Sequence, residues 1–366
     1  MENLCEKFTQ ATLPRLPKNK TMKIGCIGSG FIMAECQLSA YRKSGFCVYG
    51  IASRTYGNAK KVGERYQIPN VYQTIEELIA DTEIEIVDIA LPPHVQKDIV
   101  RLCCEQDHIR GILCQKPLAV NLNDVKEISR MCKNAGIKVA VNQNMRYDQS
   151  IRALKYALEE GYLGDPVLAS IDLRALAGVQ PFFREYGKFE ILDLAIHHLD
   201  CFRYLFGDPE KVTAVCRPDP RTPFEHRDGL SEYILQYKNG LIANSIDDGY
   251  AGPDEPCASE RYINWRVEGT GGIALGTIGW HRFPEITPST FKLASTRIPD
   301  KWLTPSWKTA WFPDAFTGTM ADLMCALEED REPVISVEDN LVTMACVEAC
   351  YKSIREERTV YLRELL

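Results

Sequence analysis

The sequence lacks the features of several protein classes. It contains no run of about 18 consecutive apolar residues, the length that a membrane-spanning helix needs, so no membrane partner is expected. No long run of lysine or arginine occurs and the formal net charge is −7, so a nucleic-acid partner is not expected either. The first 20 residues have no apolar stretch and include Glu2 and Glu6, which argues against a signal peptide. Together these absences predict a soluble, cytoplasmic protein.

The chain also has no Cys-x-x-Cys pair, although it contains 14 cysteines. Several of them, such as Cys26 and Cys114, lie in apolar segments. Buried, reduced thiols of a cytosolic protein explain this pattern best, because a zinc site needs clustered ligands. The sequence therefore predicts no metal site.

At 366 residues the chain is too long for one hydrophobic core, so two domains are expected. From Thr21 onward, strand-like apolar runs alternate with helical patterns. The expected strands cover residues 22–27, 47–53, 71–72, 84–91, 111–114 and 138–142, and the expected helices cover 31–43, 59–66, 74–79, 95–106 and 123–135. This alternation predicts an α/β fold whose N-terminal part is a doubly wound parallel sheet of the Rossmann type.

The pattern changes after Tyr147. Two helices are expected at 150–160 and 191–206, then a strand-rich stretch from 211 to 278, then helices at 315–329 and 337–355. We therefore expect an irregular N-terminal arm over 1–20 and a dinucleotide-binding Rossmann domain over 21–145. A C-terminal α/β domain is expected over 146–366, with a mainly antiparallel sheet whose open face suggests pairing with another subunit. Its last helices could pack back on the Rossmann domain.

A glycine turn follows the first expected strand. Gly28-x-Gly30 ends that strand and opens a helix, where backbone N–H groups and the helix N-terminus attract a pyrophosphate. Met33 stands where the usual motif has a third small residue. The alternative is a purely structural strand–helix turn; the surrounding strand–helix–strand pattern favours dinucleotide binding.

The second strand ends at Ser53-Arg54-Thr55, with no acidic residue to bind the ribose hydroxyls of NAD. Arg54 could contact the 2′-phosphate of NADP or stack on adenine, or it could be a solvated arginine that does not contact the cofactor. The sequence thus leaves NAD and NADP equally open.

Two further strands end in proline-containing segments, Leu91-Pro92-Pro93-His94 and Gln115-Lys116-Pro117. Ligands of doubly wound sheets bind at the carboxyl ends of the strands. Lys116 at such an end could donate a hydrogen bond to the reacting oxygen of a substrate. A surface lysine is the alternative, which the tripeptide alone would favour.

An acid–imidazole pair lies in an otherwise apolar helix. Asp193 and His197 are four residues apart and so share one helix face, with Asp200 three residues further on. Such a pair suits proton abstraction near neutral pH. His198 points elsewhere and is expected to be structural. The rival interpretations are a hydrogen-bond network without chemistry and a metal site that would also use His94.

These residues resemble the glucose–fructose oxidoreductase, inositol dehydrogenase and rhizopine-catabolism (Gfo/Idh/MocA) family, from Thr21 to Leu366. The likeness lies in the glycine turn, Leu91-Pro92-Pro93-His94, Lys116-Pro117, Asn144-Met145-Arg146-Tyr147, the Asp193–Asp200 helix with Phe206-Gly207, Val337-Glu338-Asp339 and Tyr351-Lys352-Ser353. The resemblance implies that Lys116, Asp193 and His197 are catalytic, and that the C-terminal sheet binds substrate and a second subunit. Three positions depart from the family: Gln115 replaces a glutamate, Met33 crowds the phosphate turn, and Gln96 stands where histidine is common.

The candidate cofactor-binding residues are Gly28, Gly30, Phe31, Ile32, Ser53, Arg54, Leu91, Pro92, His94, Lys116 and Asn144. The candidate substrate contacts are Arg146, Tyr147, Arg174, Asp193 and His197.

The hypothesis is an NAD(P)-dependent dehydrogenase that oxidises a secondary hydroxyl of a sugar or glycoside. The Gln-Lys-Pro variant looks similar to family members that oxidise glycosides at ring carbon 3. Alternatives are an aldose or imine reductase of the same family, a cofactor-binding sensor without turnover, and a metal-dependent hydrolase or isomerase.

Overall fold

The computed structural model describes residues 2–175, 182–222, 224–250, 252 and 260–366. The chain divides into two compact units. We call Pro14–Tyr147 with Phe312–Leu341 the nucleotide unit, and Met1–Leu13 with Asp148–Trp311 and Val342–Leu366 the sheet unit. Each unit combines segments that are distant in the sequence.

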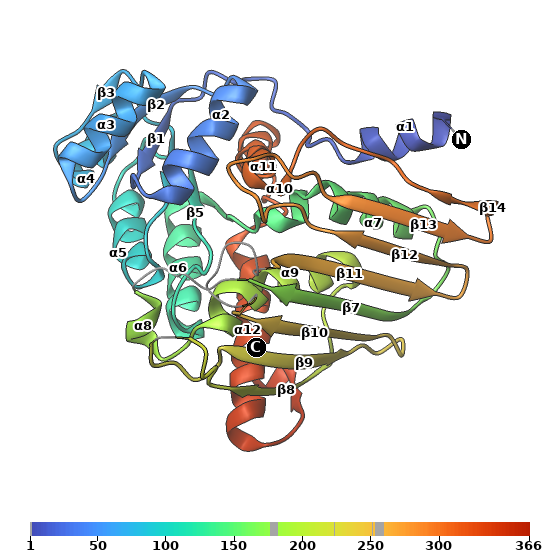
Figure 1. Cartoon of the computed structure of the whole chain (residues 1–366). Helices are drawn as coiled ribbons and strands as arrows, with labels where there is room; N and C mark the ends of the chain where they lie inside the picture. Colours follow the sequence, from blue (N-terminus) through green and yellow to red (C-terminus); the bar gives the residue numbers. More distant parts are fainter. Residues whose placement is uncertain (1, 176–181, 223, 251, 253–259) are drawn as a thin grey trace. The chain divides into compact units, whose positions relative to one another are not determined.

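The nucleotide unit contains a six-stranded parallel sheet in the order β3-β2-β1-β4-β5-β6. Figure 1 labels β1, β2, β3 and β5 of this sheet. Its strands are β1 (Ile24–Ile27), β2 (Val48–Ala52), β3 (Asn70–Val71), β4 (Ile86–Ile89), β5 (Gly111–Cys114) and β6 (Lys138–Val141). Every residue of β1, β4 and β5 is buried, as expected when both faces of a parallel sheet are covered. The predicted doubly wound sheet is thus confirmed, and this strand order is the one used for dinucleotide binding.

Helices connect these strands. They are the π-helix η1 (Ile32–Gln37), α2 (Leu38–Ser44), α3 (Tyr56–Tyr66), α4 (Ile75–Ala80), α5 (Pro93–Cys104), α6 (Leu122–Ala135) and the 3₁₀ helix η2 (Asn144–Tyr147). Polar residues begin several of them: the Thr74 hydroxyl accepts from the Glu77 N–H at 3.1 Å, and the Asn121 carbonyl oxygen accepts from the Asp124 N–H at 3.0 Å. Such caps satisfy backbone donors that have no partner within the helix.

A late helix completes the core of the nucleotide unit. Helix α11 (Phe316–Glu329) contacts β5 and β6, and its buried Phe316, Met320 and Leu323 join the core cluster that contains Ile24 of β1. Short helix α10 (Trp311–Asp314) precedes it.

The sheet unit has a nine-stranded mixed sheet in the order β14-β13-β12-β11-β7-β10-β9-β8-β15. Its described strands are β7 (Pro166–Arg174), β8 (Lys211–Arg217), β9 (Leu230–Gln236), β10 (Ile242–Asp248), β11 (Tyr262–Gly269), β12 (Gly272–Thr277), β13 (Thr290–Ser295), β14 (Ile298–Leu303) and β15 (Val360–Tyr361). Only β7 and β10 pair in parallel among these described strands, so the prediction of a mainly antiparallel sheet is confirmed.

Helices cover one face of this sheet (Figure 1). They include α7 (Gln149–Glu159), the π-helix η3 (Ile191–Ala195) and α9 (Ile196–Phe206). Further helices are α1 (Glu2–Ala11), which packs on α7, the short α8 (Phe183–Tyr186), α12 (Val337–Glu356) and the 3₁₀ helix η4 (Leu362–Glu364). Helix α7 contacts β12 and β13, and the Trp265 Nε1–H donates to Ser150 Oγ at 3.0 Å. Along β7, buried Ala169, Ile171 and Leu173 alternate with more exposed residues, which marks the covered face.

The N-terminal residues differ from the prediction of an irregular arm, because Glu2–Ala11 form α1. The reason is tertiary packing: the Phe8 side chain is fully buried against the rings of Tyr156, Tyr162 and Phe291. A short helix gains most of its stability from such contacts, which local sequence does not reveal.

Candidate active site

The glycine turn joins the ends of three strands in the nucleotide unit. Gly28 has a φ of 115°, and a Cβ there would lie 2.5 Å from the carbonyl oxygen of Ala90, so only glycine fits. The Gly28 N–H donates to Ala52 O at 2.8 Å, and Ser29 Oγ donates to Ser53 Oγ at 2.9 Å. The turn after β1 is therefore fixed to the ends of β4 and β2.

The residues of this turn fit a dinucleotide. A Cβ at Gly30 would meet nothing within 4 Å, so the backbone is open to a close approach there. Phe31 is 47% exposed at the start of the following helix, whose N-terminal N–H groups favour a phosphate. Met33, which we expected to crowd the turn, is instead fully buried in the core cluster.

The other candidate cofactor residues follow neighbouring strands. Ser53 and exposed Arg54 follow β2, Leu91 to His94 follow β4, Lys116 follows β5 and Asn144 follows β6. Because the strands are parallel, all these positions lie at one edge of the sheet, together with the glycine turn.

Lys116 is half-buried at this edge, and its peptide bond to Pro117 is cis. Its N–H donates to Gln115 Oε1 at 2.9 Å. The backbone on both sides of Lys116 is held by Gln96, a fully buried side chain of α5. The sequence marked Gln96 only as a departure from the family, because its contacts are 19 or more residues away.

Asp193 and His197 lie in the sheet unit, where the π-helix η3 continues into α9. Asp193 is half-buried, and its N–H donates to Phe189 O at 2.8 Å. His197 is 4% exposed, and its ring meets the Trp311 ring edge-on at 5.4 Å. Trp311 thus limits the positions open to the imidazole, a contact that the sequence did not suggest.

The neighbouring polar residues of α9 have structural partners. His198 Nδ1 lies 2.5 Å from Asp247 Oδ1 and 3.2 Å from Ser245 Oγ, all buried. Asp200 Oδ1 accepts from Thr343 Oγ1 at 2.8 Å. The structure thus gives His198 and Asp200 roles in packing.

The predicted substrate contacts outside this helix are engaged within their own units. The buried Arg146 guanidinium donates to Asp339 Oδ2 at 2.5 Å, and the Tyr147 ring lies against Gly318. Arg174, at the end of β7, pairs with Asp172.

Glu190 is a buried residue that sequence reasoning missed. It lies three residues before Asp193 and is fully buried, and among the residues that the structure describes neither carboxylate oxygen has a hydrogen-bond partner. Burial raises the pKa of this carboxyl well above its usual value, and the nearby charges of Asp247 and Asp193 raise it further. The surroundings of Glu190 therefore favour the neutral form of this carboxyl group.

Among the described residues, no group of three or more histidine, cysteine or carboxylate side chains could hold a metal ion. Within the same residues, no helix combines the length and the apolar character needed to cross a membrane.

Two sequence models of one family match nearly the whole chain. The oxidoreductase family NAD-binding Rossmann fold matches residues 22–143, and the C-terminal alpha/beta domain of the same family matches residues 155–362. The chain belongs to the Gfo/Idh/MocA oxidoreductase family. The resemblance inferred from the sequence is thereby confirmed, and the chain is a nicotinamide-dependent oxidoreductase.

Similar proteins in this family include dehydrogenases of known name. D-apiose dehydrogenase of Rhizobium rhizogenes is 30% identical over 94% of this chain and 99% of its own length. Myo-inositol 2-dehydrogenase of Thermotoga maritima is 26% identical over 94% of this chain and 100% of its own. An Agrobacterium radiobacter oxidoreductase, solved with NAD⁺, L-tartaric acid and magnesium, has a TM-score of 0.79 and 26% identity, covering 94% of this chain and 99% of that one.

Proposed function

We propose that this protein oxidises a secondary hydroxyl of a sugar or sugar derivative and transfers the hydride to NAD or NADP. The named apiose and inositol dehydrogenases support a polyhydroxylated substrate. The observation that carries the proposal is the placement of Lys116 on the sheet edge that also holds the glycine turn. A cationic donor at this edge is suited to bind a reacting oxygen beside a bound nicotinamide.

Each catalytic side chain has a defined role in this proposal. His197 removes the hydroxyl proton, and Asp193 orients the imidazole and stabilises its charged form. The Lys116 ammonium donates a hydrogen bond to the developing alkoxide. When bound, the nicotinamide supplies the hydride acceptor, so the alcohol becomes a ketone and one proton is released.

We also propose the position that is oxidised on the substrate, whereas the choice of cofactor stays open. The Gln115-Lys116-Pro117 sequence supports oxidation at ring carbon 3 of a glycoside. The absence of an acidic residue at Ser53-Arg54-Thr55 leaves NAD and NADP both open. Comparing kcat/KM for NAD and NADP, in the parent protein and in Arg54→Ala, would show which cofactor the protein prefers and whether Arg54 sets that preference.

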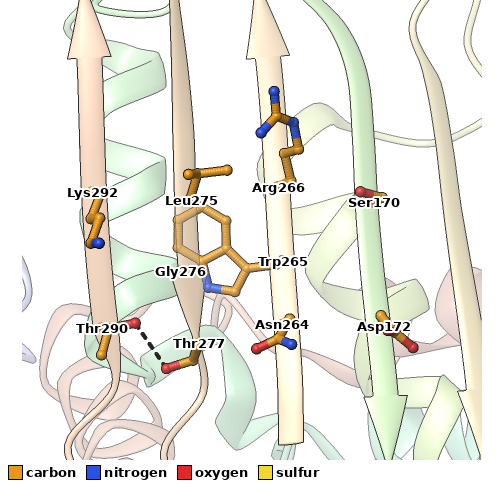
Figure 2. A pocket seen from close by; sticks show the side chains of 10 residues that line it. All are labelled: Ser170, Asp172, Asn264, Trp265, Arg266, Leu275, Gly276, Thr277, Thr290 and Lys292. Atoms are coloured by element: carbon orange, nitrogen blue, oxygen red, sulfur yellow. Dashed lines mark hydrogen bonds between the residues drawn. The ribbon is translucent and has the colours of Figure 1, made fainter. Parts of the chain in front are cut away.

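We also propose that the exposed face of the sheet unit pairs with a second copy of this chain. Figure 2 shows Asp172, Asn264, Arg266 and Lys292 on strands β7, β11 and β13 of this face. These residues line a hollow of about 400 Å³. Leu168, Ile242 and Ile234 lie exposed on adjacent strands. A broad sheet face of this kind is usually covered in the working protein.

The central experiment compares Lys116→Met and His197→Ala with the parent protein. His197→Ala should bind NAD(P)H with unchanged affinity, measured by fluorescence, and both variants should lose about 10²–10⁴-fold in kcat toward sugars. Near-parent turnover in both variants would remove these residues from the mechanism. Loss of cofactor binding by His197→Ala would indicate a structural defect instead.

A further inference from the structure

The Gln96 side chain forms several hydrogen bonds to the backbone of one short segment, residues 115–118. Its Nε2 donates to Gln115 O at 2.9 Å and to Pro117 O at 2.9 Å, with a longer approach of 3.4 Å to Leu118 O. Its Oε1 accepts from the Gln115 N–H at 2.8 Å. Backbone groups on both sides of Lys116 are therefore bonded to one side chain.

The chemistry of these contacts requires an uncharged group that both donates and accepts. Three of the four partners are carbonyl oxygens, and the fourth is an N–H. A carboxylate would face the carbonyls with negative charge, and an ammonium could not accept from Gln115 N–H. Gln96 is also fully buried, so water does not compete for these bonds.

We infer that Gln96 is a positioning residue for Lys116: it holds the segment Gln115–Leu118 so that the ammonium meets the reacting oxygen. This inference rests on the catalytic role proposed for Lys116. The Gln115 side chain extends the same arrangement, since its Oε1 accepts from the Lys116 N–H. Gln96 itself acts only through the backbone on either side of Lys116.

The side chain of Gln96 comes from a rigid element. It lies in the first turns of α5, and Val100, one turn later on the same helix, is fully buried in apolar packing. A helix fixes the position of the Gln96 amide more firmly than a loop would. Val100 also offers a matched control, because its truncation weakens α5 without removing any of the four hydrogen bonds.

The test compares Gln96→Met with Val100→Ala. Gln96→Met keeps the volume but removes every polar contact, and we expect kcat to fall by about 10–100-fold, because small misplacements of a catalytic group are costly. The KM for the sugar and the Kd for NADH should change less than about threefold. Val100→Ala should lower the melting temperature at least as much and leave kcat near the parent value.

Hydrogen–deuterium exchange provides a readout that does not depend on turnover, and a third variant distinguishes positioning from packing. Hydrogen–deuterium exchange over residues 111–118 should accelerate in Gln96→Met and not in Val100→Ala. Gln96→His, whose imidazole can donate one bond and accept another, should recover part of the lost kcat. If the kcat of all three variants merely followed their melting temperatures, the inference would be overturned.

A double-mutant cycle separates this inference from the proposed function. If Gln96 acts through Lys116, adding Gln96→Met to Lys116→Met should reduce kcat by less than about twofold. An equal loss in both backgrounds would show that Gln96 acts elsewhere. Should Lys116→Met itself turn over normally, both the proposed role of Lys116 and this inference fail; should only Gln96→Met turn over normally, the inference fails alone.

Discussion

The two units treat a buried carboxyl group in opposite ways. In the nucleotide unit, Asp88 of β4 is fully buried but accepts from Gln37 Nε2 at 2.8 Å and from Tyr41 Oη at 2.7 Å. In the sheet unit, Glu190 is equally buried, and neither of its oxygens has a hydrogen-bond partner within the described part of the chain. Burial raises the pKa of Asp88 only to about 7, because both donors oppose it, whereas that of Glu190 is raised well above its usual value.

The difference in hydrogen bonding indicates that Asp88 has a structural role, whereas Glu190 lies close to a candidate catalytic residue. Asp88 ties η1 and α2 to the centre of the parallel sheet, so its polar group supports the fold. Glu190 lies one turn before Asp193, where its charge would add to those of Asp193 and Asp247. An acidic group that the fold leaves unsatisfied is more often found near a reacting centre than in a core that only packs.

The largest expected effect contrasts the half-buried Asp193 with the buried, bonded Asp88. Asp193→Asn should lower kcat by about 10²–10⁴-fold while the Kd for NADH stays near the parent value, because in the proposed mechanism Asp193 stabilises the charged imidazole of His197. Asp88→Asn should keep its kcat, since the amide can still accept from Gln37 and donate to Tyr41 Oη. Steady-state kinetics of both variants tests this expectation. Equal losses of kcat in Asp193→Asn and Asp88→Asn would show that the two carboxylates do not differ in role.

A smaller effect is expected from removing one of the two donors to Asp88. Tyr41→Phe should lower the free energy of unfolding at pH 8 by about 1.5–3 kcal/mol, the usual contribution of a hydrogen bond to a charged group. At pH 5, where Asp88 is protonated in the folded protein, the loss should be smaller. Urea denaturation at the two pH values measures this; a loss that is the same at both would mean that Tyr41 contributes packing alone.

The smallest effect is a gain in stability. The pKa of Glu190 is higher in the folded protein than in the unfolded chain, so folding is penalised increasingly as pH rises above about 4. Glu190→Gln removes this penalty, so the stability of the variant relative to the parent should rise from pH 5 to pH 6 by at most about 1.4 kcal/mol. Thermal unfolding across that range tests it; a pH-independent difference would show that Glu190 ionises equally in both states.

The parts of the candidate site that could be predicted from the sequence are those that depend on local patterns. The glycine turn, the Lys116 strand end and the Asp193–His197 helix each occupy a few consecutive residues, so strand and helix periodicity located them. The helix Glu2–Ala11 was missed because Phe8 packs on rings more than 140 residues away. Gln96 was noted only as a departure from the family, and Glu190 was missed, for the same reason. The role of a buried amide or carboxyl group depends on its surroundings in the folded chain, which local sequence does not show.

The two glycines of the phosphate turn are under different constraints. A side chain at Gly28 would strike the backbone of Ala90, so that position is restricted by folding itself. A methyl group at Gly30 would enter empty space, and the free protein would tolerate alanine there. In the proposed cofactor site, the requirement for a small residue 30 therefore comes from the dinucleotide, and a harmful substitution there would be detected only in assays that include the cofactor.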